Sequence, residues 1–280
     1  MAGTWQSWQW DETLFLGSAP YYVRGRLPYA PALAAAMQRA LALDGTGRLI
    51  DAGCGPGIVA LRLAHLFDEV AGVDPDAGML AEAERRAREL GVRNARWVKA
   101  RAEELPLDLG TFRVATFAAS FHWMDRDRVA AIVREMLEPG GAFVQVTDVA
   151  DDRPEQEEPL PYPAPPREAI EEIKSKYLGP QRRAGQSIRV DSPSGEAEVL
   201  ARAGFGDPER ICVPFREVIL RSVEDIVAWY YSCSDTAPHL FGDRLAEFDA
   251  DMRAALAKAS PSGRFAERTE DTKIIIWRKS

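Results

Sequence analysis

Cysteine is scarce in the sequence: Cys54, Cys212 and Cys233 lie far apart among the 280 residues, without a paired spacing. A disulfide framework or a zinc site needs paired or closely spaced cysteines, so neither is expected. Sparse, unpaired thiols are typical of a reducing compartment. We therefore predict a cytoplasmic protein that holds no metal.

Positive charge is also in deficit, because 43 Asp and Glu outnumber 35 Lys and Arg and give a formal net charge of −8 at pH 7. Binding to a nucleic-acid backbone needs clustered cations, which this balance disfavours. No stretch approaches the ~18–20 apolar residues of a membrane span. Met1–Trp10 has neither the basic start nor the apolar run of a secretory signal. We expect a soluble protein that binds neither nucleic acid nor a membrane.

Apolar segments and helical patterns alternate from Arg48 to Thr147. The pattern predicts strands at 48–51, 69–74, 95–100, 112–119 and 141–147, and helices at 56–67, 77–90 and 127–137. Such alternation indicates right-handed crossovers and a parallel sheet with helices on both faces. An Ala-rich helix at 29–43 precedes it.

The pattern changes after Asp148. Helices are predicted at 167–177, 193–203, 223–233 and 242–259, and strands at 209–220 and 268–278. Helices that an open sheet does not require are expected to form a lid over its carboxyl edge. We divide the chain into an N-terminal aromatic cap and helix (1–44), a ligand-binding core (45–150), an acidic, Pro-rich linker and lid segment (151–193), and a C-terminal part of the sheet with inserted lid helices (194–280).

The strongest motif is Leu49-Ile50-Asp51-Ala52-Gly53-Cys54-Gly55-Pro56-Gly57, where a strand becomes a helix. Glycines there let the backbone turn sharply and approach a ligand, and the helix offers N–H groups to an electron-rich group. A dinucleotide fingerprint needs Gly-x-Gly-x-x-Gly, but here the third glycine comes one residue early. No Lys and Ser/Thr pair follows either, so a pyrophosphate ligand is disfavoured. A plain strand-to-helix turn is the alternative.

Two further signals follow the next strands. Asp74 ends the second predicted strand on the same edge as the glycine loop, where its carboxylate could accept hydrogen bonds from two ribose hydroxyls. A helix N-cap is the alternative for Asp74, although Asp76 could cap instead. Ala102 and Glu103 come just after the third strand and could meet an adenine edge.

Together these motifs resemble the class I S-adenosylmethionine-dependent methyltransferases, within them the small-molecule group that includes menaquinone and trans-aconitate methyltransferases. The resemblance covers Tyr22–Thr147 and continues more loosely through Ser194–Ser280. It implies S-adenosylmethionine as the cofactor. It further implies that these residues contact it: Arg26, Asp51, Gly53, Gly55, Gly57, Asp74, Met79, Ala102, Glu103 and Ala118. Among them Arg26 would pair with the cofactor carboxylate, although Leu27 separates it here from Pro28. Core packing is the alternative for Met79.

Acceptor residues are sought after the fourth strand and in the lid. His122 could deprotonate an acceptor, since its ordinary pKa lies near neutrality, or it could only orient its loop. Trp123 could stack on an acceptor or only fill space. Tyr21, Tyr22 and Trp229 complete the predicted acceptor site, and this aromatic lining favours an apolar or aromatic small molecule.

The sequence thus predicts a Rossmann-like, doubly wound α/β fold with a seven-stranded, mostly parallel sheet, its last strand antiparallel, and a helical lid. The predicted function is methyl transfer from S-adenosylmethionine to oxygen, nitrogen or carbon of a small molecule. Two alternatives are a non-catalytic or non-methylating S-adenosylmethionine-binding protein of the same fold and, less favoured, a nicotinamide-dependent oxidoreductase. The oligomeric state is not readable from the sequence.

Overall fold

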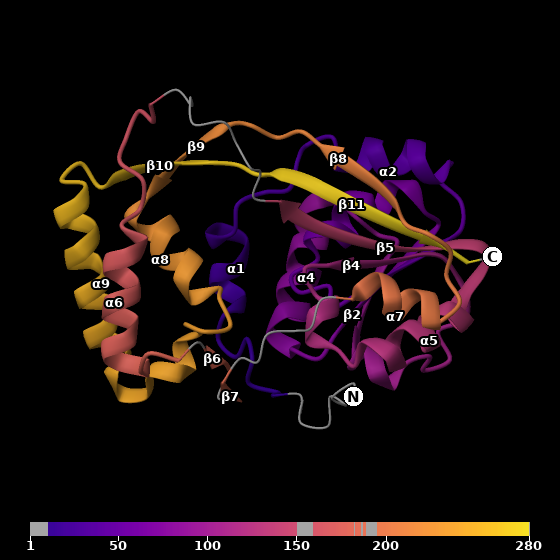
Figure 1. Cartoon of the computed structure of the whole chain (residues 1–280), viewed down its shortest axis with the longest axis horizontal. Helices are drawn as coiled ribbons and strands as arrows, with labels where there is room; N and C mark the ends of the chain where they lie inside the picture. The colour runs from indigo at the N-terminus through magenta and orange to yellow at the C-terminus, as the bar shows by residue number, and fades with distance from the viewer. Residues whose placement is uncertain (1–10, 150–158, 182, 186, 189–194, 280) are drawn as a thin grey trace.

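The computed structural model describes residues 11–149, 159–181, 183–185, 187–188 and 195–279. The tryptophans Trp5, Trp8 and Trp10 and the acidic run 151–158, both noted in the sequence, lie outside these ranges. None of the helices in the described ranges combines the length and apolar character that crossing a bilayer requires. The chain forms a sheet lobe and a helical lobe, joined by extended segments (Figure 1).

The sheet lobe is built on a seven-stranded sheet with the order β3-β2-β1-β4-β5-β11-β8. Its strands are β1 (Arg48–Ala52), β2 (Glu69–Asp74), β3 (Ala95–Lys99), β4 (Phe112–Ala118), β5 (Leu137–Val149), β8 (Glu209–Val213) and β11 (Asp271–Arg278). The first five pair in parallel, and β11 runs antiparallel to both β5 and β8. The predicted sheet, with its last strand antiparallel, is confirmed.

Helices cover both faces of this sheet. They are α2 (Leu33–Leu41), α3 (Ile58–Leu63), α4 (Ala77–Leu90), α5 (Arg126–Met136) and α7 (Glu196–Arg202), with short 3-10 turns η1 (Ala64–Leu66), η2 (Ala102–Glu104) and η3 (Phe121–Trp123). Neighbouring strand residues point to opposite faces, so Leu49 packs with α2 and α3, whereas Ile50 packs with α5 and α7. The buried strands therefore hold the carboxyl edge of the sheet rigidly.

The helical lobe has its own core. It contains α1 (Ala19–Gly25), α6 (Arg167–Leu178), α8 (Val223–Tyr231), η4 (Pro238–Arg244), α9 (Leu245–Ala259) and a two-stranded sheet of β9 (Val218–Ser222) and β10 (Arg264–Arg268). Ile170 of α6, Ile226 of α8, Phe248 of α9 and Phe265 of β10 are buried together. A small hairpin joins β6 (Arg183–Ala184) to β7 (Ser187–Ile188). Helix α1 comes from the N-terminal part of the chain but lies against α8 (Figure 1).

The predicted single strand at 209–220 is wrong. The structure divides it into β8, in the large sheet, and β9, in the helical lobe. Pro214 has no N–H to donate to a ladder, and the next amide, Phe215 N, donates instead to Asp271 Oδ1 at 2.8 Å. The predicted strand 268–278 corresponds to β11, which begins at Asp271, while Arg268 is the last residue of β10. The helix expected from Gly242 begins at Leu245, because Gly242 has a φ of +52°.

Candidate functional site

The glycine loop connects β1 to α3 at the carboxyl edge of the sheet. Gly53, Gly55 and Gly57 all have positive φ, of +67°, +51° and +71°. Only glycine adopts such angles without steric cost. The N–H groups of Gly53 and Cys54 donate to Val73 O, at 2.8 and 3.1 Å, and fix the loop against the end of β2.

The three glycines face different surroundings. A Cβ on Gly57 would lie 2.8 Å from Trp97 of β3, and one on Gly53 would lie 2.6 Å from the Cβ of Ser120. A Cβ on Gly55 would meet nothing within 4 Å. Gly57 therefore serves close packing, whereas Gly55 leaves open space at the sheet edge for a ligand.

Asp74 ends β2 beside this open space. Its carboxylate accepts hydrogen bonds from Gly55 N, at 2.8 Å, and from Asp76 N, at 2.9 Å. Burial raises the pKa of Asp74 to about 6. The N-cap of α4 is Asp76, which accepts from Met79 N at 2.9 Å. The capping alternative weighed for Asp74 is therefore wrong.

A first cavity lies at this edge and gathers most of the residues predicted to hold the cofactor. It is lined by Glu12, Phe15, Tyr22, Gly53, Gly55, Asp74, Pro75, Asp76, Met79, Arg101, Ala102, Glu103, Ala118, Ala119, Ser120, Trp123 and Met124. Seven of the ten predicted cofactor residues are among them. The side chain of Glu103 also accepts from Asp125 N at 2.8 Å, which fixes η2 to the start of α5.

The other three predicted cofactor residues lie elsewhere. Asp51 is fully buried inside β1, where it accepts from Thr116 Oγ1 at 2.8 Å and from Ala60 N at 3.2 Å. Burial raises the pKa of Asp51 to about 7. It connects β1 to β4 and α3 and lines none of the cavities described here. Gly57 packs on Trp97, and Arg26 faces two further cavities.

A second cavity lies between the two lobes and contains the predicted His122 and Trp229. Aromatic rings of Phe15, Tyr22, Trp123, Trp229 and Tyr230 line part of it. The rest is polar, and includes His122, Glu171, Lys174, Ser175, Gln181, Ser234, Asp235 and Thr236. The ammonium of Lys174 forms ion pairs with Glu171 and, at 3.2 Å, with Asp235. Tyr21, predicted here, instead packs its ring against Tyr231 in the helical lobe.

A third cavity continues from the glycine loop past Arg26. It shares Gly53, Gly55 and Ala118 with the first cavity, and Arg26 and Trp229 with the second. Nη2 of Arg26 donates to Ser232 O at 2.9 Å, and its guanidinium lies 5.0 Å from the centre of the Tyr22 ring. Nε of Arg26 is buried and has no hydrogen-bond partner among the described residues.

Several lining residues were not predicted. Ala119 lines all three cavities and has a φ of +49°, an uncommon angle for a residue with a Cβ and one that often marks a functional site. Asp148, near the end of β5, lines the third cavity, where partial desolvation and the carboxylate of Glu270 raise its pKa to about 6. Phe15 precedes α1 and lines the first two cavities. Only the position of Ala119 at the end of one predicted strand, and of Asp148 just after another, could have indicated them.

Comparison with known proteins agrees with this arrangement. Residues 49–141, which include the glycine loop, Asp74, Ala102 and Glu103, match a family described as methyltransferase domain. This segment, about a third of the chain, is similar to the methyltransferase domain of the class I S-adenosylmethionine-dependent type. S-adenosylmethionine, predicted as the cofactor, is confirmed as that of the family. The open space at Gly55 and the carboxylate of Asp74 fit such a ligand.

Two relatives indicate how far this chain resembles known methyltransferases. An uncharacterized methyltransferase of Mycobacterium tuberculosis is 33% identical over 148 residues, which cover 51% of this chain and 56% of that protein. The malonyl-(acyl-carrier protein) O-methyltransferase of Enterobacter lignolyticus is 36% identical over 110 residues, covering 39% and 41%. The chain thus spans about half the length, or less, of these curated relatives.

The fold extends further than these alignments. The crystal structure of the YcgJ protein from Bacillus subtilis superimposes with a TM-score of 0.51 at 17% identity, covering 88% of this chain and 97% of that chain. Identity this low shows a shared fold alone. The narrower resemblance to menaquinone and trans-aconitate methyltransferases stays a prediction.

Proposed function

We propose that this protein transfers a methyl group from S-adenosylmethionine to a small-molecule acceptor bound between the two lobes. One observation carries the proposal. Gly55 and Asp74 are joined by a 2.8 Å hydrogen bond and line a single cavity, which shares lining residues with a second one that contains a histidine and aromatic rings. Ligand-binding backbone and a buried carboxylate therefore adjoin a separate space that an acceptor could occupy.

The residues of the first and third cavities would hold the cofactor. Asp74 would accept hydrogen bonds from the ribose, Ala102 and Glu103 would contact the adenine edge, and Met79 would pack on its ring. The guanidinium of Arg26 would pair with the cofactor carboxylate, since its Nε is buried and has no hydrogen-bond partner in the described part of the chain. The cofactor would supply an activated methyl group: the acceptor atom would attack the methyl carbon in line with the carbon–sulfur bond, which would break and release S-adenosylhomocysteine.

The residues of the second cavity would hold the acceptor. Phe15, Tyr22, Ala119 and Trp123 line both the first and the second cavity, so they mark where acceptor and cofactor would meet. The aromatic lining supports an aromatic acceptor, and the polar residues opposite support polar substituents on it. His122 would remove a proton from a hydroxyl or an amine. The lobes would exclude water and align the two reactants, which supplies most of the rate gain in a direct displacement.

Binding and transfer must be tested separately, because the same fold also serves proteins that bind the cofactor without methylating. Calorimetric titration with S-adenosylmethionine, S-adenosylhomocysteine and NAD should show binding of the first two alone. Labelled methyl should then appear on a member of a panel of phenols, amines and carboxylic acids, and an Asp74→Ala protein should label nothing. Binding without transfer to any acceptor class would support the non-methylating alternative, and binding of NAD alone would support an oxidoreductase.

A further inference from the structure

Helix α1 packs in the helical lobe, whereas residues in its last turn and just after it line the cavities. Tyr22 lies within α1 and Arg26 follows its last residue, Gly25. A Cβ on Gly25 would overlap the backbone carbonyl of Ala228 in α8. Glycine there lets the two helices touch backbone to backbone. The placement of Tyr22 and Arg26 therefore depends on how α1 is held against α8.

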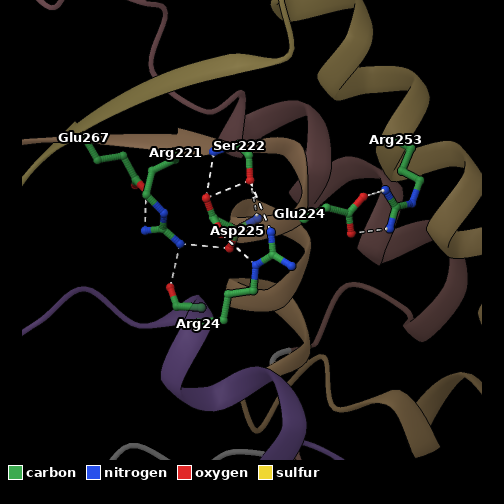
Figure 2. Close-up of polar contacts among 8 residues, drawn as sticks. Arg24, Arg221, Ser222, Glu224, Asp225, Arg253 and Glu267 are labelled. Atoms are coloured by element: carbon green, nitrogen blue, oxygen red, sulfur yellow. Dashed lines mark hydrogen bonds and ion pairs between the residues drawn. The ribbon is translucent and has the colours of Figure 1, made fainter.

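A buried side chain, Arg221, holds the end of α1 in addition to the exposed ion pair of Arg24 with Asp225 at 2.7 Å. Arg221 of β9 is 4% exposed, and its guanidinium donates to Gly25 O at 2.7 Å and to Asp225 O at 2.8 Å (Figure 2). Its Nη1 donates to Glu267 Oε2 of β10 at 3.0 Å. Arg221 thus joins β9, β10, α8 and the carbonyl group that immediately precedes Arg26.

Glu267 extends the same contact to a second arginine. Its other carboxylate oxygen accepts from Arg167, the first residue of α6. The Arg167 guanidinium lies 4.5 Å from the centre of the Trp229 ring, and both residues line the third cavity. Arg221 itself lines none of the three cavities. It is linked to Arg26 through the carbonyl group of the preceding residue, Gly25, and to Arg167 through the carboxylate of Glu267.

We propose that Arg221 is a positioning residue, which sets the two cavity arginines, Arg26 and Arg167, for cofactor and acceptor binding; this inference rests on the proposed function. Three acceptors in different directions require the planar fork of a guanidinium. A lysine ammonium keeps the charge but is a compact point donor, so it would reach Glu267 or the two carbonyl groups, not all of them. Losing the geometry of these hydrogen bonds should therefore raise the Kd more than losing the positive charge does.

The test compares the full chain with Arg221→Met and Arg221→Lys by calorimetric titration with S-adenosylhomocysteine, at a temperature well below the Tm of each protein. Removing charge-assisted hydrogen bonds to the carbonyl before Arg26 should raise the Kd by about tenfold in Arg221→Met, with partial recovery in Arg221→Lys. The control is Arg253→Met. Arg253 belongs to the neighbouring ion network of Glu224 and Asp249 but does not contact α1, so its loss should leave the Kd within about twofold (Figure 2).

A second variant, Gly25→Ala, should disturb the placement of Arg26 without changing any charge. Gly25→Ala must displace α1 from α8, and it should reproduce the weaker binding of Arg221→Met. It also supplies the test if Arg221→Met does not fold. Folded Arg221 and Gly25 variants that bind S-adenosylhomocysteine with the unmutated Kd would overturn the inference and leave the proposed function intact. An unmutated chain that binds no S-adenosylhomocysteine would overturn both.

Discussion

The backbone N–H of Gly55 donates to Oδ2 of Asp74 at 2.8 Å, across 19 residues of sequence. This hydrogen bond joins the glycine loop to the end of β2, so the two strongest motifs of the sequence form one structural unit. The carboxylate that would bind a ribose also holds the glycine loop in place at the end of β2. Substitutions at either residue should therefore disturb the same binding step.

The open space at Gly55 predicts that even one added methyl group will impair cofactor binding. In Gly55→Ala the new Cβ meets no protein atom within 4 Å and projects into space that the ligand would use, so the Kd for S-adenosylhomocysteine should rise at least about tenfold. Backbone strain is controlled by Gly91→Ala. Gly91 ends α4 with a φ of +69° and equally open surroundings, but lines none of the three cavities. Both variants should lose about 1 kcal/mol of stability; equal cofactor affinities would remove Gly55 from the site.

The raised pKa of Asp74 predicts a pH-dependent affinity. Burial places the pKa near 6, so the carboxyl is ionised at pH 7.5 and increasingly protonated below pH 6. Since the ionised form is the better hydrogen-bond acceptor for ribose hydroxyls, the Kd for S-adenosylhomocysteine should rise by up to about tenfold between pH 7.5 and pH 5. Asp74→Asn should bind weakly at both values, with no such rise. A pH dependence that persists in Asp74→Asn would assign it to another group, such as Asp148.

Local motifs made the core and much of the cofactor site predictable. Alternating strands and helices identify the parallel sheet, and its carboxyl edge necessarily brings Gly55, Asp74 and Ala102 together. Asp74 ends its strand, and Gly55 and Ala102 lie three residues past the ends of β1 and β3. Asp51 shows the limit of this reasoning: it belongs to the same motif, but one residue of strand alternation turns its side chain toward Thr116 and Ala60, away from the cavity.

The helical lobe was less predictable because its contacts are long-range. Helix α1 has seven residues and no capping side chain, so its stability depends on tertiary contacts, mainly with α8. Pro214 interrupts a pattern that otherwise fits one continuous strand, and thereby moves β9 into the other lobe. The contact of Arg221 with Gly25 joins residues 196 apart, and no local pattern indicates such a pair.

His122 should affect turnover more than binding. It lines the second cavity but not the first, so His122→Ala should leave the Kd for S-adenosylhomocysteine within about twofold while kcat falls by about a hundredfold, the usual size of a general-base contribution. Labelled methyl transfer to an acceptor found in the panel measures kcat. His65→Ala is the matched control, because His65 is exposed on η1 and lines none of the three cavities. Unmutated turnover in His122→Ala would make the histidine structural.

Asp51 should make the fold less stable as the pH rises. Burial raises its pKa from 3.8 to about 7, so the folded protein favours the protonated carboxyl. The stability that Asp51 contributes is fully present below the pKa that its carboxyl has in the unfolded chain, and it is lost as the pH rises through about 7. The Tm of the protein should therefore fall between pH 5 and pH 8, and it should fall less in Asp51→Asn, whose amide keeps a similar shape beside Thr116.

The control for the direction of this pH dependence is Asp44→Asn. Hydrogen bonds from Thr46 and Arg113 hold the pKa of Asp44 below its usual range, so that variant should lose stability at neutral pH without flattening the profile. Thermal unfolding followed by circular dichroism across this range decides the matter, and an Asp51→Asn profile parallel to that of the unmutated protein would contradict the assignment.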